Sequence, residues 1–155
     1  IVVALKQVSE RSAATIVAST SRRTPAAIEQ FLRQELQGYA LCKMLIIANE
    51  HNPEGSIDAL FHSSDLLVIS GDSISMISEA LGYGKYVFVF PLTRKKPHMV
   101  SKHERFVQLL ENDGYLRVVG DAGIGNIIMD TWRRKPAVKT LPDSGRVIEA
   151  LKRIL

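Results

Sequence analysis

The stretch at residues 65–92, DLLVISGDSISMISEALGYGKYVFVFPL, decides how this chain is organised. It begins and ends with apolar runs that are typical of buried strands. Between these runs come a Gly-Asp-Ser turn, apolar residues at helical spacing (Ile74, Ile77 and Leu81) and a second turn at Gly84. A strand, a helix and a strand in this order predict a βαβ unit, in which the two strands run parallel.

The rest of the chain continues this alternation. Predicted strands lie at residues 15–20, 43–48, 65–70, 86–90 and 115–119. Predicted helices lie at residues 1–10 (with a strand as the alternative), 25–37, 56–61, 101–113, 122–132 and 143–155, in addition to the one after Ser73. Because the strands are continuously apolar rather than alternating, we predict an α/β fold with a parallel sheet and helices on both of its faces.

Two helices have predicted caps and apolar faces. Thr24 is the expected N-cap of the second helix, with Pro25 at its first helical position and Ile28, Phe31, Leu32 and Leu36 as its buried face. Ser101 and Glu104 form a capping box, and the helix that they open is expected to bury Phe106, Leu109 and Leu110. The stretch at residues 133–141 is the nearest thing to a linker.

The composition is that of a globular protein. The 155 residues are 46% hydrophobic and 23% charged, and this length suits one domain, residues 1–155. No apolar run approaches the roughly 20 residues that cross a bilayer, so we predict no transmembrane segment. The chain does not begin with Met and starts inside regular structure, which predicts a fragment of a longer two-domain protein with its own N-terminal domain as a partner.

Cysteine content and charge narrow the classes further. The single cysteine, Cys42, excludes a disulfide framework and indicates a reducing compartment, so we predict a cytoplasmic location. The four histidines show no metal-ligand spacing, and no metal is predicted. The net charge of +4 suits an anionic ligand, but without a basic stripe and interleaved aromatic residues it does not indicate nucleic acid.

The turn after the third predicted strand is a candidate phosphate site. Gly71, Asp72 and Ser73 lead into a helix N-terminus, where free backbone N–H groups and the positive end of the helix dipole attract anions. Glu79, four residues past Ser75, is placed to meet a sugar next to that phosphate. The alternative is that Asp72 or Ser73 caps the helix and that Glu79 is solvated. Spacing alone leaves both open.

Basic loops are predicted at the same edge of the sheet. Ligands of open parallel sheets bind beyond the carboxyl ends of the strands, where loops 21–24, 49–55, 71–75 and 91–98 lie. Arg22 and Arg23 directly follow one strand and suit bidentate phosphate contacts, and Arg94, Lys95 and Lys96 follow another. The alternative for each cluster is a solvated basic loop. Together with the helix N-terminus, the clusters favour a nucleotide or another phosphorylated ligand.

Several catalytic signatures are missing. No Gly-Lys-Ser/Thr follows Gly71, and the chain has no GxGxxG, which disfavours a P-loop NTPase and a standard NAD enzyme. Ser73 has no evident histidine partner for a catalytic triad. No catalytic residue is therefore identified.

Three motifs together resemble a known family. They are Ser21-Arg22-Arg23-Thr24-Pro25, then Asn52-Pro53-Glu54-Gly55, then Gly71-Asp72-Ser73-Ile74-Ser75-Met76-Ile77-Ser78-Glu79-Ala80 with Gly84-Lys85. In this order they resemble the mitochondrial fission (elongated mitochondria) family, whose members occur in plants and widely in bacteria. The resemblance runs from about Thr15 to about Val119 and corresponds to the C-terminal half of such a protein, with no matching motif beyond Val119.

The resemblance implies a fold and a ligand. The family is similar to two-domain glycosyltransferases of the B fold (GT-B), whose C-terminal Rossmann-like domain binds the nucleotide-sugar donor. It implies that residues 73–75 contact phosphate, that Glu79 binds the ribose and that Arg22 neutralises the diphosphate, with Arg23 as a second candidate. The candidate ligand-binding residues are Ser21, Arg22, Arg23, Gly71, Asp72, Ser73, Ile74, Ser75 and Glu79. No cofactor is expected beyond a nucleotide or nucleotide sugar as ligand.

The resemblance also implies an alternative function. Plant members are implicated in recruiting a dynamin-related protein to mitochondria, so the fold could serve as a non-catalytic adaptor on the cytosolic face of that organelle. The basic cluster Trp132-Arg133-Arg134-Lys135 suits a partner domain or acidic lipid, although a solvated helix end is its simpler interpretation. Whether the protein is an enzyme is left open, with glycosyl transfer as the activity if it is one.

Overall fold

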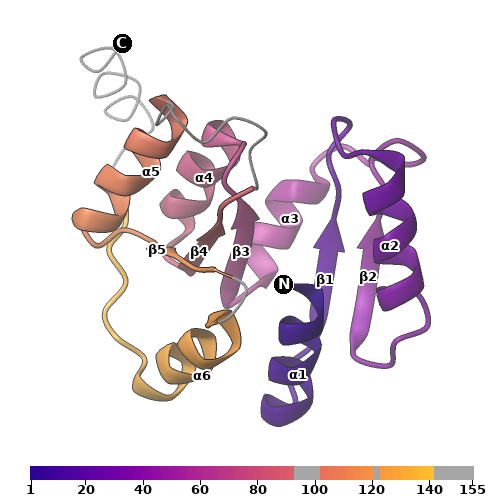
Figure 1. Ribbon diagram of the computed structural model, residues 1–155, viewed down its shortest axis with the longest axis horizontal. Coiled ribbons are helices and arrows are strands. Elements are labelled where there is room, and N and C mark those ends of the chain that lie inside the picture. Colours follow the sequence, from indigo (N-terminus) through magenta and orange to yellow (C-terminus); the bar gives the residue numbers. More distant parts are fainter. Residues whose placement is uncertain (93–101, 121–122, 142–155) are drawn as a thin grey trace. The chain divides into compact units, whose positions relative to one another are not determined.

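The computed structural model describes residues 1–92, 102–120 and 123–141 and divides the chain into two compact units. Unit 1 comprises Ile1–Leu60 and Gly123–Arg134, and unit 2 comprises Phe61–Ala122 and Lys135–Leu155 (Figure 1). Each unit has a parallel sheet, and the described residues form six α-helices and one 3-10 helix. The predicted α/β class is confirmed and is consistent with a Rossmann-like fold. The single-domain organisation stays a prediction.

Unit 1 contains a parallel pair of strands. Strand β1 (Ile16–Ser19) pairs with β2 (Cys42–Ile46), with Val17 opposite Met44. Helix α2 (Ala26–Leu36) lies between them in the sequence, as the crossover of a parallel pair requires. Both strands therefore end at the same edge of the sheet. The loop after β2 leads to α3 (Ser56–Ser63), whose residues span the boundary between the units.

Two helices that are far apart in the sequence pack against each other in unit 1. Helix α1 (Val2–Ser12) contacts α6 (Ile124–Arg134). A Cβ atom on Gly125 would lie 3.7 Å from Val8 Cγ2 and 3.9 Å from Ala4 Cβ, so small residues bring the two backbones close together. Both predicted helices are confirmed, and each ends two residues later than predicted.

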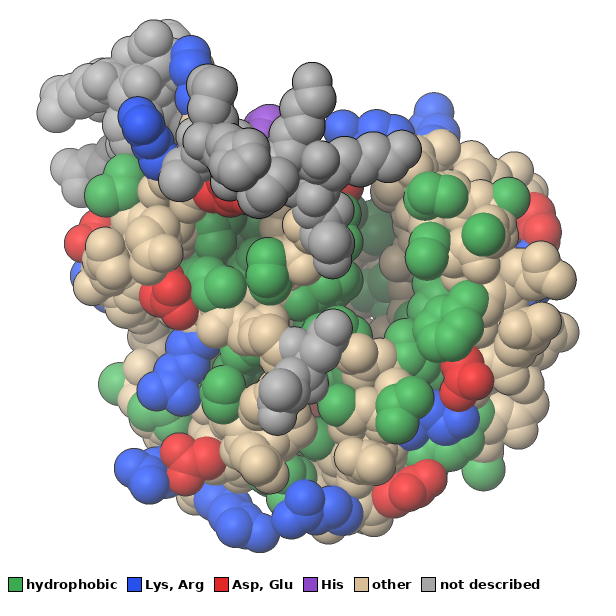
Figure 2. Space-filling view, viewed as in Figure 1, with side chains coloured by type: hydrophobic (Ala, Val, Ile, Leu, Met, Phe, Trp, Pro, Cys, Tyr) green, Lys and Arg blue, Asp and Glu red, His purple; other side chains and the backbone are tan. Residues whose placement is uncertain are grey.

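The buried face of α2 differs from the predicted one. Ile28 and Phe31 are 49% and 42% exposed, whereas Glu29 and Leu36 are buried. Figure 2 shows hydrophobic side chains at the surface over this helix. Placing Ile28 and Phe31 in the core is therefore wrong. Ile28 and Phe31 lie on one face of α2, and Leu36 lies on the adjacent face together with Glu29. The helix buries the face with Glu29 and Leu36.

The start of α2 also differs by one residue. Pro25, with φ −60° and ψ 142°, is the N-cap residue, and no side chain caps the helix. The predicted cap, Thr24, is wrong because its hydroxyl is used in the preceding turn, where it accepts a hydrogen bond from Ser21 N–H at 2.9 Å.

Three parallel strands in the order β3-β4-β5 form the sheet of unit 2. Strand β3 (Leu66–Ser70) pairs with β4 (Tyr86–Phe90) over its whole length, and β4 pairs with β5 (Arg117–Val118). After β3, helix α4 (Ile74–Ala80) continues into a 3-10 turn, η1 (Leu81–Tyr83). Gly84, at φ 66°, then reverses the chain into β4. The predicted βαβ unit is confirmed.

The core of unit 2 contains the apolar residues that the sequence pattern indicates. Ile77 is fully buried, Leu81 is 1% exposed, and the central residues of β4 are almost as inaccessible. Burying one such side chain stabilises the fold by about 1.5–3 kcal/mol, so the apolar face of α4 holds it to β3 and β4. Other buried apolar residues of unit 2 are Phe61, Leu67, Ile69, Ala80, Val87, Phe88, Val89, Phe106, Val107, Leu110, Leu116 and Val119.

Helix α5 (Lys102–Asn112) buries one residue other than predicted. Phe106 and Leu110 are in the core as expected, but Leu109 is 45% exposed and Val107 is buried instead. The prediction of Leu109 as a core residue is wrong. Val107 and Leu109 lie on opposite sides of Phe106 and Leu110 on the helix surface, and the helix buries the side with Val107.

The segment at residues 135–141 is bound to unit 2 rather than being a free linker. Tyr86 Oη donates a hydrogen bond to the Pro136 carbonyl at 3.0 Å, and Lys139 Nζ donates one to the Asp113 carbonyl at 2.8 Å. The interpretation of this stretch as a linker is therefore wrong, because its composition did not reveal these long-range bonds.

Some predictions lie outside the described residues. They concern the basic residues Arg94, Lys95 and Lys96, the helix cap Ser101 and the last helix at residues 143–155. Across the ranges that the structure describes, no helix has the length and apolar character to pass through a membrane.

Candidate functional site

The loop at residues 71–75 leaves the carboxyl end of β3 in unit 2. Gly71 N–H donates a hydrogen bond to the Phe90 carbonyl at 2.9 Å, which extends the β3–β4 ladder by one residue. A Cβ atom on Gly71 would lie 3.3 Å from the same carbonyl oxygen, closer than most Cβ atoms approach an oxygen. Glycine therefore lets the chain turn from the sheet into α4 directly beside the neighbouring strand.

The N-terminus of α4 has no side-chain cap. Ser73 is the N-cap residue, with φ −115° and ψ 90°, but its hydroxyl makes no capping hydrogen bond. The first hydrogen bond of the helix joins Ile77 N–H to the Ser73 carbonyl at 3.1 Å. The N–H groups of residues 74–76 precede that bond and point out of the helix end. A cap by Ser73, one of the alternatives that the spacing left open, is therefore excluded.

Polar side chains continue along α4 from this end. Ser75 and Glu79 are exposed and four residues apart, which places them on one face of the helix about 6 Å apart along its axis. Ser73 Oγ lies 3.5 Å from Ser75 Oγ, and Asp72 is exposed beside them. The helix end thus offers hydrogen-bond donors first and a carboxylate further along.

In unit 1, the loop at residues 21–24 leaves the carboxyl end of β1; we call it the arginine loop. Its own hydroxyl groups close it. Thr24 Oγ1 accepts a hydrogen bond from Ser21 N–H at 2.9 Å, and Ser21 Oγ accepts one from Arg23 N–H at 3.2 Å. Thr24 N–H donates to the Ser21 carbonyl at 2.9 Å. The backbone N–H groups of Ser21, Arg23 and Thr24 are therefore all used inside the loop.

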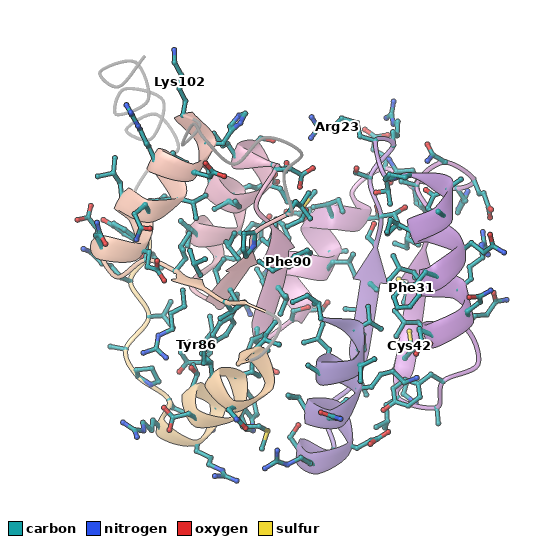
Figure 3. The ribbon with its side chains drawn as sticks, viewed as in Figure 1. Arg23, Phe31, Cys42, Tyr86, Phe90 and Lys102 are labelled. Atoms are coloured by element: carbon teal, nitrogen blue, oxygen red, sulfur yellow. The ribbon has the colours of Figure 1, made fainter. Side chains whose placement is uncertain are left out.

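The two arginines carry the exposed charge of this loop. Arg22 and Arg23 are exposed, and Figure 3 shows Arg23 beyond the carboxyl end of β1. Neither guanidinium makes an ion pair with another residue in the described part of the chain. Because most backbone donors of the loop are occupied, it offers an anion guanidinium groups rather than a nest of backbone N–H groups.

A buried carboxylate behind the arginine loop was not predicted from the sequence. Glu29, in the first turn of α2, is 9% exposed. Its Oε1 accepts hydrogen bonds from Asn49 Nδ2 at 2.8 Å and from Thr20 Oγ1 at 3.3 Å. Thr20 Oγ1 in turn accepts one from Ala48 N–H at 2.9 Å. These four residues join the end of β1, the end of β2 and the first turn of α2.

The sequence held one signal for this network. An acidic residue in the first turn of a helix is favoured by the helix dipole, and Glu29 stands there. Ile28 and Phe31 have the helical spacing of a buried apolar face, and Glu29 does not lie on that face. The sequence pattern therefore predicts that Ile28 and Phe31, rather than Glu29, point into the core. Only the packing of α2 on the sheet distinguishes the two stripes.

The predicted site residues fall into two groups that belong to different units. Ser21, Arg22 and Arg23 are in unit 1, and residues 71–75 with Glu79 are in unit 2. The structure brings together the members of each group within its own unit. The basic residues at 94–96 lie outside the described residues.

Other reactive side chains in the described ranges form no second candidate site. No three His, Cys, Asp or Glu residues there are placed to hold a metal ion. Cys42 is half-buried at the start of β2, with its Sγ 3.5 Å from the Met44 carbonyl oxygen. Burial raises the pKa of its thiol, which makes it a poor nucleophile at neutral pH.

The basic cluster at the end of α6 is on the surface. Trp132 is 36% exposed, and Arg133 and Arg134 are exposed beside it. Arg134 Nε pairs with Asp130 Oδ1 at 2.8 Å, one turn earlier on the helix. The cluster combines an aromatic surface with positive charge, which is common at protein interfaces.

A family model covers nearly the whole chain. The model described as Mitochondrial fission ELM1 matches residues 1–153. The match extends beyond the predicted limits of the resemblance, Thr15 and Val119, at both ends, so the absence of a counterpart beyond Val119 is wrong. No curated protein and no solved structure matches the chain.

Proposed function

Because the chain belongs to the mitochondrial fission ELM1 family, we propose that it is the nucleotide-sugar-binding part of a glycosyltransferase-like protein. The observation that carries this proposal is the uncapped N-terminus of α4, which follows a glycine turn at the carboxyl end of β3. Parallel sheets bind ligands at this edge, and free N–H groups at a helix N-terminus stabilise a phosphate.

Each polar group of the α4 end has a role in this proposal. The N–H groups of residues 74–76 bind a phosphate of the nucleotide, and the hydroxyls of Ser73 and Ser75 donate hydrogen bonds to its oxygens. Glu79, one turn further along, accepts hydrogen bonds from the ribose hydroxyls. The exposed carboxylate of Asp72 faces solvent, since two anions side by side repel each other.

Arg22 and Arg23 stay predicted diphosphate ligands. Both are exposed, and a guanidinium binds phosphate oxygens bidentately. In sugar transfer, the bond from the anomeric carbon to the diphosphate oxygen breaks, and the sugar bonds to the acceptor. A guanidinium stabilises the negative charge that develops on the leaving diphosphate. We assign neither the acceptor site nor a general base to the described residues.

The proposal is tested by nucleotide binding to the whole chain. Thermal-shift and ligand-observed NMR measurements with UDP, GDP, ADP, CMP and their sugar conjugates should identify one base that binds. Glu79→Gln should then weaken this ligand about tenfold, because it removes a charge-assisted hydrogen bond. The control is Asp65→Asn, an exposed acid of unit 2 that precedes β3 at the opposite edge of the sheet.

Three results would contradict the proposal. One is the absence of binding by every nucleotide and nucleotide sugar in the panel. Another is an equal dissociation constant for wild type and Glu79→Gln. A loss of affinity in Asp65→Asn as large as in Glu79→Gln would also contradict it, since the effect would then not come from α4.

The second candidate is a protein adaptor, supported by the exposed cluster at the end of α6. In this version Trp132 and Arg133 contact a dynamin-related GTPase, and the protein acts on the cytosolic face of mitochondria. Binding of the purified GTPase should be lost in a Trp132→Ala, Arg133→Ala double variant and kept in Arg11→Ala, an exposed arginine of α1. Unchanged binding by the double variant would remove this candidate.

A further inference from the structure

We propose that Glu29 is a positioning residue that holds the arginine loop ready for its anionic ligand. Thr20 and Asn49 connect its carboxylate to the ends of β1 and β2. The inference rests on the proposed function, in which Arg22 and Arg23 are predicted diphosphate ligands. It goes further by assigning a role to a buried residue that touches no ligand.

The burial of Glu29 indicates that its carboxylate is held for its hydrogen bonds. A buried charge costs free energy unless it is paired or hydrogen-bonded. Glu29 is buried in the same turn in which the apolar Ile28 is exposed. Its Oε1 accepts two hydrogen bonds, and the first turn of a helix favours negative charge. The side chain therefore contributes geometry rather than apolar burial.

The hydrogen bonds fix Thr20, the residue directly before the arginine loop. Thr20 N–H donates to the Ile46 carbonyl at 2.9 Å, and Thr20 Oγ1 accepts from Ala48 N–H at 2.9 Å. The hydroxyl proton is then left to donate to Glu29 Oε1 at 3.3 Å. Three bonds to two other elements thus hold the point at which the chain enters the loop.

The exit of the arginine loop leads into the helix that carries the same carboxylate. Thr24 bonds to Ser21 through both its N–H and its hydroxyl, and α2 begins two residues later. Glu29 lies in the first turn of that helix, so its backbone follows the exit while its side chain holds the entry. Arg22 and Arg23 therefore project from a loop whose entry is bonded to the Glu29 side chain and whose exit leads into the helix that carries Glu29.

A loop held in this way binds an anion with a smaller ordering cost. The backbone is ordered before the ligand arrives, and only the arginine side chains lose freedom on binding. Without the carboxylate, Thr20 loses a bond at the entry of the arginine loop and Asn49 loses its acceptor after β2, so the entry of the loop loosens.

The test uses the whole chain with inorganic pyrophosphate as the anion. Binding is followed by NMR at the Nε–Hε groups of Arg22 and Arg23, which separates this loop from any other anion site. Glu29→Ala should weaken binding there about tenfold, whereas Glu29→Gln should change it less than about threefold, because the amide oxygen still accepts from Thr20 and Asn49. The control is Glu35→Gln, at the far end of α2 in an ion pair with Lys6.

A second measurement, amide hydrogen exchange, tests the inference without pyrophosphate. Amide hydrogen exchange of Thr24 and Ala48 should become about tenfold faster in Glu29→Ala, while Ile16 N–H, bonded to the Leu41 carbonyl at the start of β1, should be unaffected. Equal affinity and equal exchange in wild type and Glu29→Ala would overturn the inference. Faster exchange throughout unit 1 with unchanged affinity would overturn it too, since Glu29 would then only stabilise the fold.

Failure of the proposed function gives a different result. In that case the Arg22 and Arg23 signals of the wild type do not respond to pyrophosphate at all. The inference is then overturned together with the proposed function, because the arginine loop binds no anion. If only the inference is wrong, the wild type responds, Arg22→Ala weakens the response, and Glu29→Ala binds like the wild type.

Discussion

The arginine loop of unit 1 and the loop at residues 71–75 of unit 2 start from similar residues and offer different groups to a ligand. Both follow a parallel strand, both contain hydroxyl side chains, and both lead into a helix. In the arginine loop, Ser21 and Thr24 use up the backbone N–H groups. In the other, Ser73 leaves the helix end uncapped. One loop therefore presents cationic side chains and the other presents backbone donors.

The helices behind the two loops are also anchored differently. Helix α4 is held by apolar burial, with Ile77 fully inaccessible. The first turn of α2 is held by the hydrogen bonds of Glu29, while Ile28 beside it faces outward. Apolar burial is insensitive to direction, but hydrogen bonds fix one geometry. Under the proposed role of Glu29, this directional anchor sets the geometry of the arginine loop.

The largest expected difference is between the apolar anchors. Ile77→Ala should lower the free energy of unfolding by about 2–5 kcal/mol, because it opens a cavity under α4. Ile28→Ala should lower it by less than about 1 kcal/mol, since half of that side chain is already exposed. Urea unfolding of both variants measures the difference. Equal losses would mean that α2 relies on apolar burial in the same way as α4.

A smaller effect is expected at the turn into α4. Gly71→Val should cost about 1–3 kcal/mol, because a Cβ atom there crowds the Phe90 carbonyl oxygen. Gly82→Val is the matched control, since a Cβ atom at that position meets nothing within 4 Å, and it should stay within about 0.5 kcal/mol of wild type. If the two variants were equally stable, the close approach at Gly71 would not constrain the loop.

The hydroxyl groups of the two loops should differ by about 1 kcal/mol. Thr24→Val removes the acceptor of Ser21 N–H and should destabilise the chain by about 0.5–1.5 kcal/mol. Ser73→Ala removes a hydroxyl that does not cap α4 and should change stability by less than about 0.5 kcal/mol. Thermal unfolding of Thr24→Val and Ser73→Ala measures this difference in stability. A loss of about 1 kcal/mol in Ser73→Ala, the usual value of an N-cap, would contradict the uncapped helix end.

The smallest expected effect concerns pH and unit 1. Burial, followed by the hydrogen bond to Glu10, raises the pKa of Tyr39 above its ordinary value of 10.0. The protonated phenol is therefore favoured in the folded state. Its contribution to stability is fully present below about pH 10 and is lost as the pH rises through the raised pKa. Thermal midpoints should fall less steeply above about pH 10 in Tyr39→Phe than in wild type. Parallel curves would show that Tyr39 does not take part.

The sequence predicts most of the architecture and half of the site. The period of the apolar residues identifies β3, α4 and β4, since local pattern and tertiary burial agree there. The glycine turn at Gly71 and the place of Glu79 on α4 also follow from spacing. The predictions of buried residues fail at Phe31 and Leu109. Each of these helices has apolar residues on two adjacent faces, and periodicity does not say which face packs inward.

The sequence alone predicts the succession of parallel strands and helices along the chain, and which loops follow the carboxyl ends of the strands. Those features depend on interactions a few residues apart, which the spacing of side chains records. The burial of Glu29 and the meeting of Thr20 and Asn49 on its carboxylate follow from tertiary packing. These outcomes depend on distant segments of the chain, whose distances no local pattern contains.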